Sequence, residues 1–175
     1  MGVMTRSSSL RFCMALALSA FTAAPAFAQS APKLAGTHGD WSVYTRGSGA
    51  DRICYVLSEA QDKSPTSVNH GDIYFMVSNW KNGAAKEQPS FLAGYELKTT
   101  RAPKAQVGST ALTMFAADNE AFISENVNER RLVSKMRAGS TMTVSAVSRR
   151  GTQTRYTFSL KGVTAALRQA KTACS

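Results

Sequence analysis

Short apolar segments alternate with turn-forming residues from residue 40 onward, and this spacing predicts β-strands. The alternation is clearest in 141–146 and 154–160, where every second side chain is apolar. Strands filled with β-branched and aromatic residues at this spacing favour an antiparallel sandwich or barrel. The expected strands cover 40–44, 52–58, 73–80, 91–97, 105–107, 112–115, 141–146 and 154–160.

Two of these segments predict which side chains are buried. In 52–58, Ile53, Tyr55 and Leu57 share one face, so we expect Cys54 on the opposite face to point outward. Segment 73–80 is apolar on both faces, which is typical of a central strand covered on two sides.

Two further segments have apolar residues at helical spacing. One helix is expected over 129–137, with Asn128 as its N-cap and Gly139 just past its end. The second is expected over about 163–171 and would bring the C-terminal residues back toward an earlier strand. The residues expected to be buried are Leu132, Val133 and Met136 on the first helix, and Val163, Ala166, Leu167 and Ala170 on the second.

The first 28 residues have the organisation of a cleaved secretory signal. Arg6 and Arg11 precede an apolar run over 12–24, and Pro25-Ala26-Phe27-Ala28 supplies the cleavage motif. The run is shorter than the roughly 20 residues that span a bilayer, and no second apolar segment follows. We therefore expect export to the periplasm, with or without outer-membrane attachment, and a mature chain without a transmembrane segment. The expected parts are a signal at 1–28, a flexible lead-in at 29–38 and one domain at 39–175.

Removal of the signal leaves a basic chain with two cysteines. The loss of Arg6 and Arg11 leaves 19 basic and 11 acidic residues, a net charge of +8. Cys13 is lost as well, so Cys54 and Cys174 remain. An even pair in an oxidising compartment predicts one disulfide.

Basic residues are concentrated in the last quarter of the chain and form a candidate surface for an anionic partner. Guanidinium and ammonium groups bind phosphate and carboxylate groups, so envelope components or acidic envelope proteins would fit. The alternative is a solvated face that only keeps the protein soluble. Nucleic acid is not expected, because the chain is exported and has no recognised binding motif. The candidate residues are Arg149, Arg150, Arg155, Lys161, Arg168 and Lys171.

The sequence contains no constellation that is typical of catalysis. There is no Gly-x-Ser-x-Gly motif, and the acidic residues are scattered. His38 and His70 are each followed by Gly-Asp, which is ordinary turn chemistry and a weak basis for a metal site. We therefore expect no enzymatic activity, no catalytic residues, no metal and no cofactor.

Short motifs lie at both ends of the expected domain. Gly39-Asp40-Trp41 opens it, and Ser148-Arg149-Arg150-Gly151 leads into Ser159-Leu160-Lys161-Gly162-Val163-Thr164-Ala165-Ala166-Leu167 and a cysteine near the end. In order and spacing these motifs resemble the invasion-associated locus B family of bacterial envelope proteins over residues 39–174. The resemblance implies an immunoglobulin-like antiparallel β-sandwich with a short inserted helix and a C-terminal helix. It also implies an envelope location and a link to host-cell invasion in some pathogens, but no reaction or catalytic residue. Many relatives have a cysteine shortly after Asp-Trp, which this chain lacks.

The function expected from these observations is that of an exported, non-enzymatic binding or interaction protein. Its partners would be anionic envelope or host-surface components, or other envelope proteins. Two alternatives remain open: a structural or stress-adaptive envelope factor without a specific ligand, and a hydrolase with an unfamiliar site. An exposed apolar groove bordered by arginine would favour the binding or interaction protein, and uniform polar coverage would favour the envelope factor without a specific ligand. A deep pocket with convergent His, Asp or Ser would favour the hydrolase. The oligomeric state also remains open.

Overall fold

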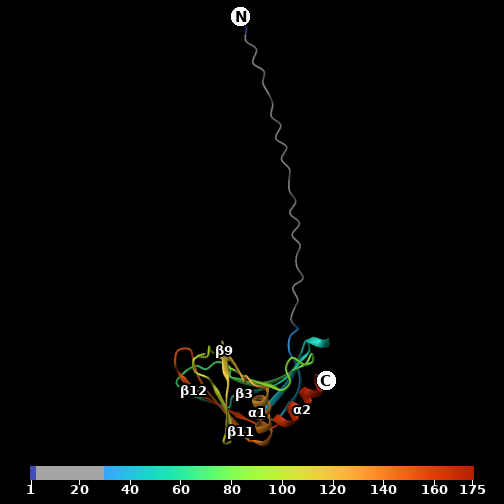
Figure 1. The fold of residues 1–175 in the computed structure, drawn as a ribbon, viewed down its shortest axis with the longest axis vertical. Helices are drawn as coiled ribbons and strands as arrows, with labels where there is room; N and C mark the ends of the chain where they lie inside the picture. The colour runs from blue at the N-terminus through green and yellow to red at the C-terminus, as the bar shows by residue number, and fades with distance from the viewer. Residues whose placement is uncertain (3–29) are drawn as a thin grey trace.

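The computed structural model describes residues 1–2 and 30–175, so nearly all of the expected signal and its cleavage site lie outside the described residues. Two antiparallel sheets and two helices form the domain (Figure 1). The larger sheet has the strand order β1 (Lys33–His38), β2 (Trp41–Arg46), β3 (Ile53–Glu59), β5 (Tyr74–Trp80), β6 (Gln88–Leu92), β10 (Glu120–Phe122), β9 (Phe115–Ala117). The smaller sheet has the order β4 (Asp62–Ser64), β12 (Gln153–Ser159), β11 (Thr141–Val147), β7 (Lys104–Val107), β8 (Thr110–Thr113). This arrangement confirms the expected antiparallel β-sandwich with an inserted and a C-terminal helix.

The two sheets contact each other through aromatic side chains from their inner faces. The ring centroids of Phe75 on β5 and Phe158 on β12 lie 5.8 Å apart in an edge-to-face arrangement. Those of Phe91 and Tyr156 lie 5.5 Å apart, and all four residues are completely buried. Such aromatic pairs contribute about 0.5–1.5 kcal/mol each beyond the area that they bury. The apolar residues of the alternation in 154–160 therefore lie on the buried face of β12.

Helices α1 (Asn126–Ala138) and α2 (Val163–Ala173) lie on the same side of the larger sheet and contact each other (Figure 1). Helix α2 contacts β1, β2, β3 and β5, and α1 contacts β6, β7 and β8. Both helices bury every apolar residue that their periodicity predicted.

The expected N-cap of α1 is wrong, while its C-cap is confirmed. The helix begins three residues earlier than expected, with Glu125 as N-cap and without a side-chain capping bond. Asn128 lies inside the first turn, where its Nδ2 donates to Glu125 Oε2 at 3.0 Å. Its side chain therefore binds another side chain rather than a helix N–H group. Gly139 is the C-cap and donates its N–H to the Lys135 carbonyl.

The segment expected to be a flexible lead-in contains strand β1, so that expectation is wrong for residues 33–38. The strand pairs with β2 from Lys33 opposite Thr45 to His38 opposite Trp41. An edge strand is held mainly by backbone hydrogen bonds on one side and needs little side-chain burial. Because β1 is mostly exposed, its sequence carries no apolar alternation from which it could be recognised.

The two motifs that carry the family resemblance contact each other. The Asp40 N–H donates to the Lys161 carbonyl at 3.0 Å, and Trp41 Nε1 donates to the Ser159 carbonyl at 2.9 Å. Gly162 has φ of 92°, and a Cβ at this position would lie 2.0 Å from the His38 carbonyl oxygen. Trp41 is completely buried and belongs to the hydrophobic core. The motifs therefore join the β1–β2 turn to the turn before α2.

The cysteines form the expected pair, but Cys54 points in the opposite direction. Cys54 and Cys174 are bonded, with their Cα atoms 5.7 Å apart. Cys54 is completely buried on the inner face of β3, where α2 packs, whereas Ile53, Tyr55 and Leu57 lie on the outer face and are half-buried. The prediction of an alternating strand over 52–58 is therefore confirmed, but the prediction of which of its faces is buried is wrong.

Candidate functional site

The outer face of the larger sheet carries apolar side chains that no described element covers. Along β5, Phe75 and Val77 point inward and are completely buried. On the opposite face Tyr74 and Met76 are half-buried, and Trp80 is 40% exposed. The expectation that this strand is covered on two sides is therefore wrong for the described residues. Exposed apolar surface of this kind is typical of an interaction site.

Strand register gathers part of this face into a groove of about 330 Å³. Met76 on β5 is paired with Ser90 on β6, and Ser90 is paired with Phe122 on β10. Two positions along β5 from Met76, Ser78 is paired with Tyr55 on β3. We call this feature the aromatic groove; it is lined by Arg46, Ile53, Tyr55, Met76, Ser78, Trp80, Gln88, Ser90, Glu120 and Phe122.

Pairs of contacting aromatic rings extend the apolar surface beyond both sides of the aromatic groove. The rings of Tyr44 and Tyr55 are stacked with centroids 5.4 Å apart, and those of Phe115 and Phe122 lie 5.7 Å apart. Burial, and then the neighbouring Tyr44, raises the pKa of the Tyr55 hydroxyl, which is therefore a neutral hydrogen-bonding group. The groove offers aromatic rings, hydroxyls and an amide, with Arg46 and Glu120 as its charged lining residues.

The six basic residues expected to form one surface do not lie together. Arg149 and Arg150 lie in the turn between β11 and β12, whereas Lys161 lies beyond the other end of β12. The seven residues of β12 alone extend over about 20 Å. Arg149 Nη1 is also paired with Glu96 Oε2 at 2.6 Å. Arg168 and Lys171 are exposed on α2.

Arg155 instead joins basic residues that the sequence analysis missed. It lies on the outer face of the smaller sheet, beside a hollow of about 630 Å³ to which Arg101 and Lys104 also contribute. We call this hollow the basic cleft. Apolar Ala105 and Val107 alternate with Lys104, and this signal could have placed Lys104 on an outer face. Its proximity to Arg155, 51 positions away, comes from strand pairing that local sequence does not reveal.

The two histidines have separate partners. His38 Nε2 lies 2.7 Å from Gln169 Oε1 on α2. His70 is buried, with Nδ1 2.9 Å from the Tyr156 hydroxyl and Nε2 2.8 Å from the Pro65 carbonyl oxygen. Among residues 1–2 and 30–175, no group of three or more His, Cys, Asp or Glu side chains could hold a metal ion.

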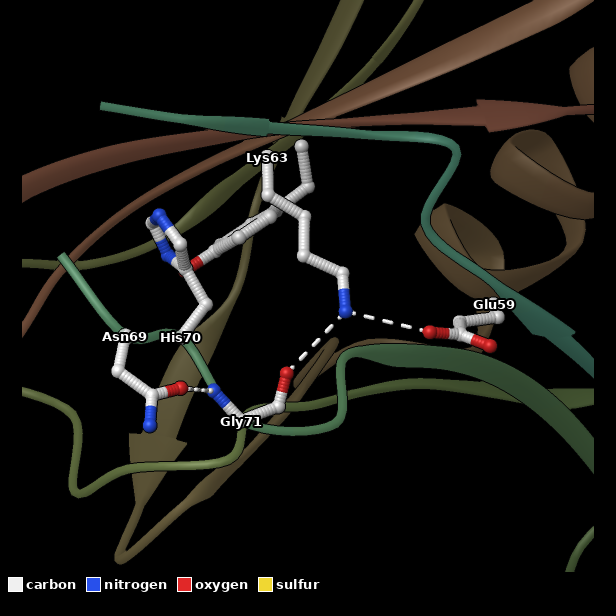
Figure 2. Close-up of polar contacts among 6 residues, drawn as sticks. Glu59, Lys63, Asn69, His70 and Gly71 are labelled. Atoms are coloured by element: carbon white, nitrogen blue, oxygen red, sulfur yellow. Dashed lines mark hydrogen bonds and ion pairs between the residues drawn. The ribbon is translucent and has the colours of Figure 1, made fainter. Parts of the chain in front are cut away.

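Polar contacts fix the loop that contains His70 (Figure 2). Lys63 Nζ on β4 donates to Glu59 Oε1 at 3.2 Å and to the Gly71 carbonyl at 3.1 Å, while Asn69 Oδ1 accepts the Gly71 N–H. Because Glu59 ends β3, these contacts join the larger sheet to β4 of the smaller one. The contacts of His70 are therefore explained by the structure of this corner of the sandwich.

A buried hydroxyl chain continues from His70 across the core. The Tyr156 hydroxyl donates to the Tyr95 hydroxyl at 2.8 Å, and Tyr95 lies 2.7 Å from Thr154 Oγ1. Burial, and then the Tyr95 hydrogen bond, strongly raises the pKa of Tyr156. Tyr156 is consequently neutral. Its buried hydroxyl is hydrogen-bonded, as is usual for buried polar groups in stable proteins.

No helix within the described parts of the chain combines the length and apolar character that a bilayer span requires. Among curated protein sequences, none matches the chain. The structure is similar to that of invasion associated protein b from Bartonella henselae, with a TM-score of 0.55 and 14% sequence identity. The similarity covers 82% of this chain and 98% of the Bartonella chain and shows a shared fold. The family described as invasion associated locus B (IalB) protein matches residues 41–171. Because this match covers most of the chain, the protein belongs to the invasion associated locus B family.

Proposed function

We propose that this chain is an exported, non-enzymatic interaction protein of the bacterial envelope, and that it binds a partner through the aromatic groove. The observation that carries the proposal is an apolar, partly aromatic sheet face that no described element covers. The outer face of a sandwich strand is ordinarily polar, with the apolar residues directed inward. An apolar outer face adds nothing to the core, whereas a partner that covered it would gain hydrophobic free energy.

Family membership supports the envelope location and the association with invasion that the family's description states. A hydrolase receives no support from either of the two hollows. Glu120 is the acidic residue that lines the aromatic groove, and neither hollow is lined by a histidine that could act as base for its serines. A serine without such a base is not activated as a nucleophile. The apolar groove likewise favours an interaction protein over an envelope factor with a uniformly polar surface.

The groove is tested by site-specific photo-crosslinking in cells. Trp80, exposed at the groove, is replaced by a photoreactive phenylalanine analogue, and Val127, 58% exposed on α1, is replaced likewise as the control. We expect discrete adducts at position 80, several times more abundant than at position 127, detected by gel shift and mass spectrometry. Adding Tyr55→Ala removes part of the groove wall and should reduce these adducts.

Equal adduct patterns at positions 80 and 127 would contradict a specific groove. Absence of adducts at both positions would favour the envelope factor without a specific ligand. The unfolding midpoints of both photoreactive proteins should match that of the parent, because each replaced side chain is substantially exposed.

Export is tested separately. We expect the chain recovered from the periplasmic fraction to begin at Gln29, because the small residues Ala26 and Ala28 suit the signal peptidase. N-terminal sequencing of that fraction is the measurement. An intact Met1 in the membrane fraction, or a start before Phe21, would show that the N-terminal segment is not such a signal.

A further inference from the structure

The basic cleft concentrates positive charge without internal neutralisation. Among the described residues, no hydrogen bond or ion pair engages the side chains of Arg101, Lys104 or Arg155. No acidic residue lines the cleft, and Asp62 lies two positions along β4 from the lining residue Ser64. Three cations held near each other repel unless an anion binds between them.

Strand register sets the spacing of these charges. Lys104 on β7 is paired with Ser145 on β11, and Ser145 is paired with Arg155 on β12. Neighbouring strands lie about 4.8 Å apart, so the Cα atoms of Lys104 and Arg155 are about 10 Å apart, with Ser145 between them. Both long side chains can therefore reach a group bound above the Ser145 hydroxyl. Arg101, in the loop before β7, lines the same hollow.

We propose that the basic cleft binds a phosphomonoester carried on a saccharide. A monocarboxylate would neutralise only one of the three cations, whereas a phosphomonoester carries about −1.5 to −2 charges and three acceptor oxygens. Guanidinium groups bind such oxygens in a two-pronged geometry, and the ammonium of Lys104 adds a point charge.

The size and lining of the cleft favour a sugar as the group that carries the phosphate. A hollow of about 630 Å³ has room for far more than an inorganic ion. Hydroxyl and amide groups of Thr100, Ser145 and Gln153 line it beside the cations. Such groups can donate and accept hydrogen bonds, as sugar hydroxyls require. The basic cleft shares no lining residue with the aromatic groove, so this proposal goes beyond the proposed function.

Binding of glucose 1-phosphate to the purified protein at low salt, measured by calorimetry, tests the proposal. We expect the triple variant Arg101→Gln, Lys104→Gln and Arg155→Gln to weaken binding by roughly tenfold or more, since it removes three charge-assisted contacts. The control, Lys86→Gln, Arg131→Gln and Lys135→Gln, removes the same charge from exposed positions outside the cleft and should change affinity by less than about twofold. Arg155→Gln alone should produce an intermediate loss.

Probes of related chemistry distinguish the possible ligands. Glucose should not bind measurably, and glucuronate should bind more weakly than glucose 1-phosphate. Equally tight glucuronate binding, an equal loss in both triple variants, or no binding of the sugar phosphate would overturn the proposal. So would binding only to phosphatidylglycerol vesicles without competition by the sugar phosphate, because that result would indicate a lipid surface. Crosslinking at Trp80 is independent of these outcomes, so the two proposals fail separately.

Discussion

Replacing Cys174 by alanine is expected to lower the free energy of unfolding by about 4 kcal/mol, with a fall in the unfolding midpoint of roughly 10 °C. The disulfide closes a loop with a sequence separation of 120 residues. In the chain-entropy view, a cross-link over so long a loop removes many conformations from the unfolded chain. Thermal or denaturant unfolding of the parent and the variant is the measurement.

The native fold should survive this substitution, because other contacts hold the same segment. Arg52 Nη1 donates to the Ala173 carbonyl and Lys81 Nζ to the Ser175 carbonyl, and α2 buries its apolar face against the larger sheet. The loss should therefore appear in stability while the circular dichroism spectrum remains that of the parent.

Reductant supplies the matched control. It should lower the midpoint of the parent toward that of Cys174→Ala and leave the variant unaffected. In the native variant Cys54 should react slowly with thiol reagents, since it is completely buried. Two reactive thiols in freshly isolated parent protein would refute the disulfide in the cell.

Strand positions could be predicted from the sequence where one face of the strand is apolar and the other polar. The alternation of Met142, Val144 and Ala146 marks the buried face of β11 correctly. On β3 the same reasoning selects the wrong face, because Ile53, Tyr55 and Leu57 are more apolar than the residues directed inward. Periodicity reveals that two faces differ, but it cannot distinguish a core from an apolar surface that another molecule would cover.

The candidate sites were less predictable than the fold, because strand pairing assembles them. Arg149 and Arg150 are close in sequence to Arg155, yet Arg149 pairs with Glu96 and both lie in a turn. Lys104 is distant in sequence and is brought near Arg155 by the β7–β11–β12 pairing. Clusters of charge along a chain therefore predict a surface only when a single element, such as a helix face, carries them.

The two proposed sites share no lining residue and belong to different sheets. The aromatic groove lies on the outer face of the larger sheet and the basic cleft on the outer face of the smaller one. The hydrophobic core lies between the two sheets, so the two proposals together predict that a partner in the groove and an anionic group in the cleft can be bound at the same time. Binding at two sites of one rigid body raises the effective concentration of each partner near the other.

Gly162→Ala is expected to destabilise the protein by about 2–5 kcal/mol, because it combines backbone strain with a steric collision. The residue has φ of 92°, a left-handed conformation that costs an alanine about 1–2 kcal/mol. Its Cβ would also lie 2.0 Å from the His38 carbonyl oxygen, so the β1–β2 turn would have to move away. Overpacking of this kind adds roughly 1–3 kcal/mol. The Asp40–Lys161 and Trp41–Ser159 hydrogen bonds lie at the same contact and would be strained with it.

Gly151→Ala separates the two contributions. Gly151 has φ of 95°, nearly the same as Gly162, but nothing lies within 4 Å of the Cβ that alanine would add. Its substitution should therefore cost only the backbone strain of about 1–2 kcal/mol. Denaturant unfolding measures the loss in free energy of unfolding for each variant. The difference between the two losses is the contribution of the close contact between the two family motifs. Equal losses at the two glycines would show that this contact adjusts freely and that the motifs do not stabilise the fold by their close approach.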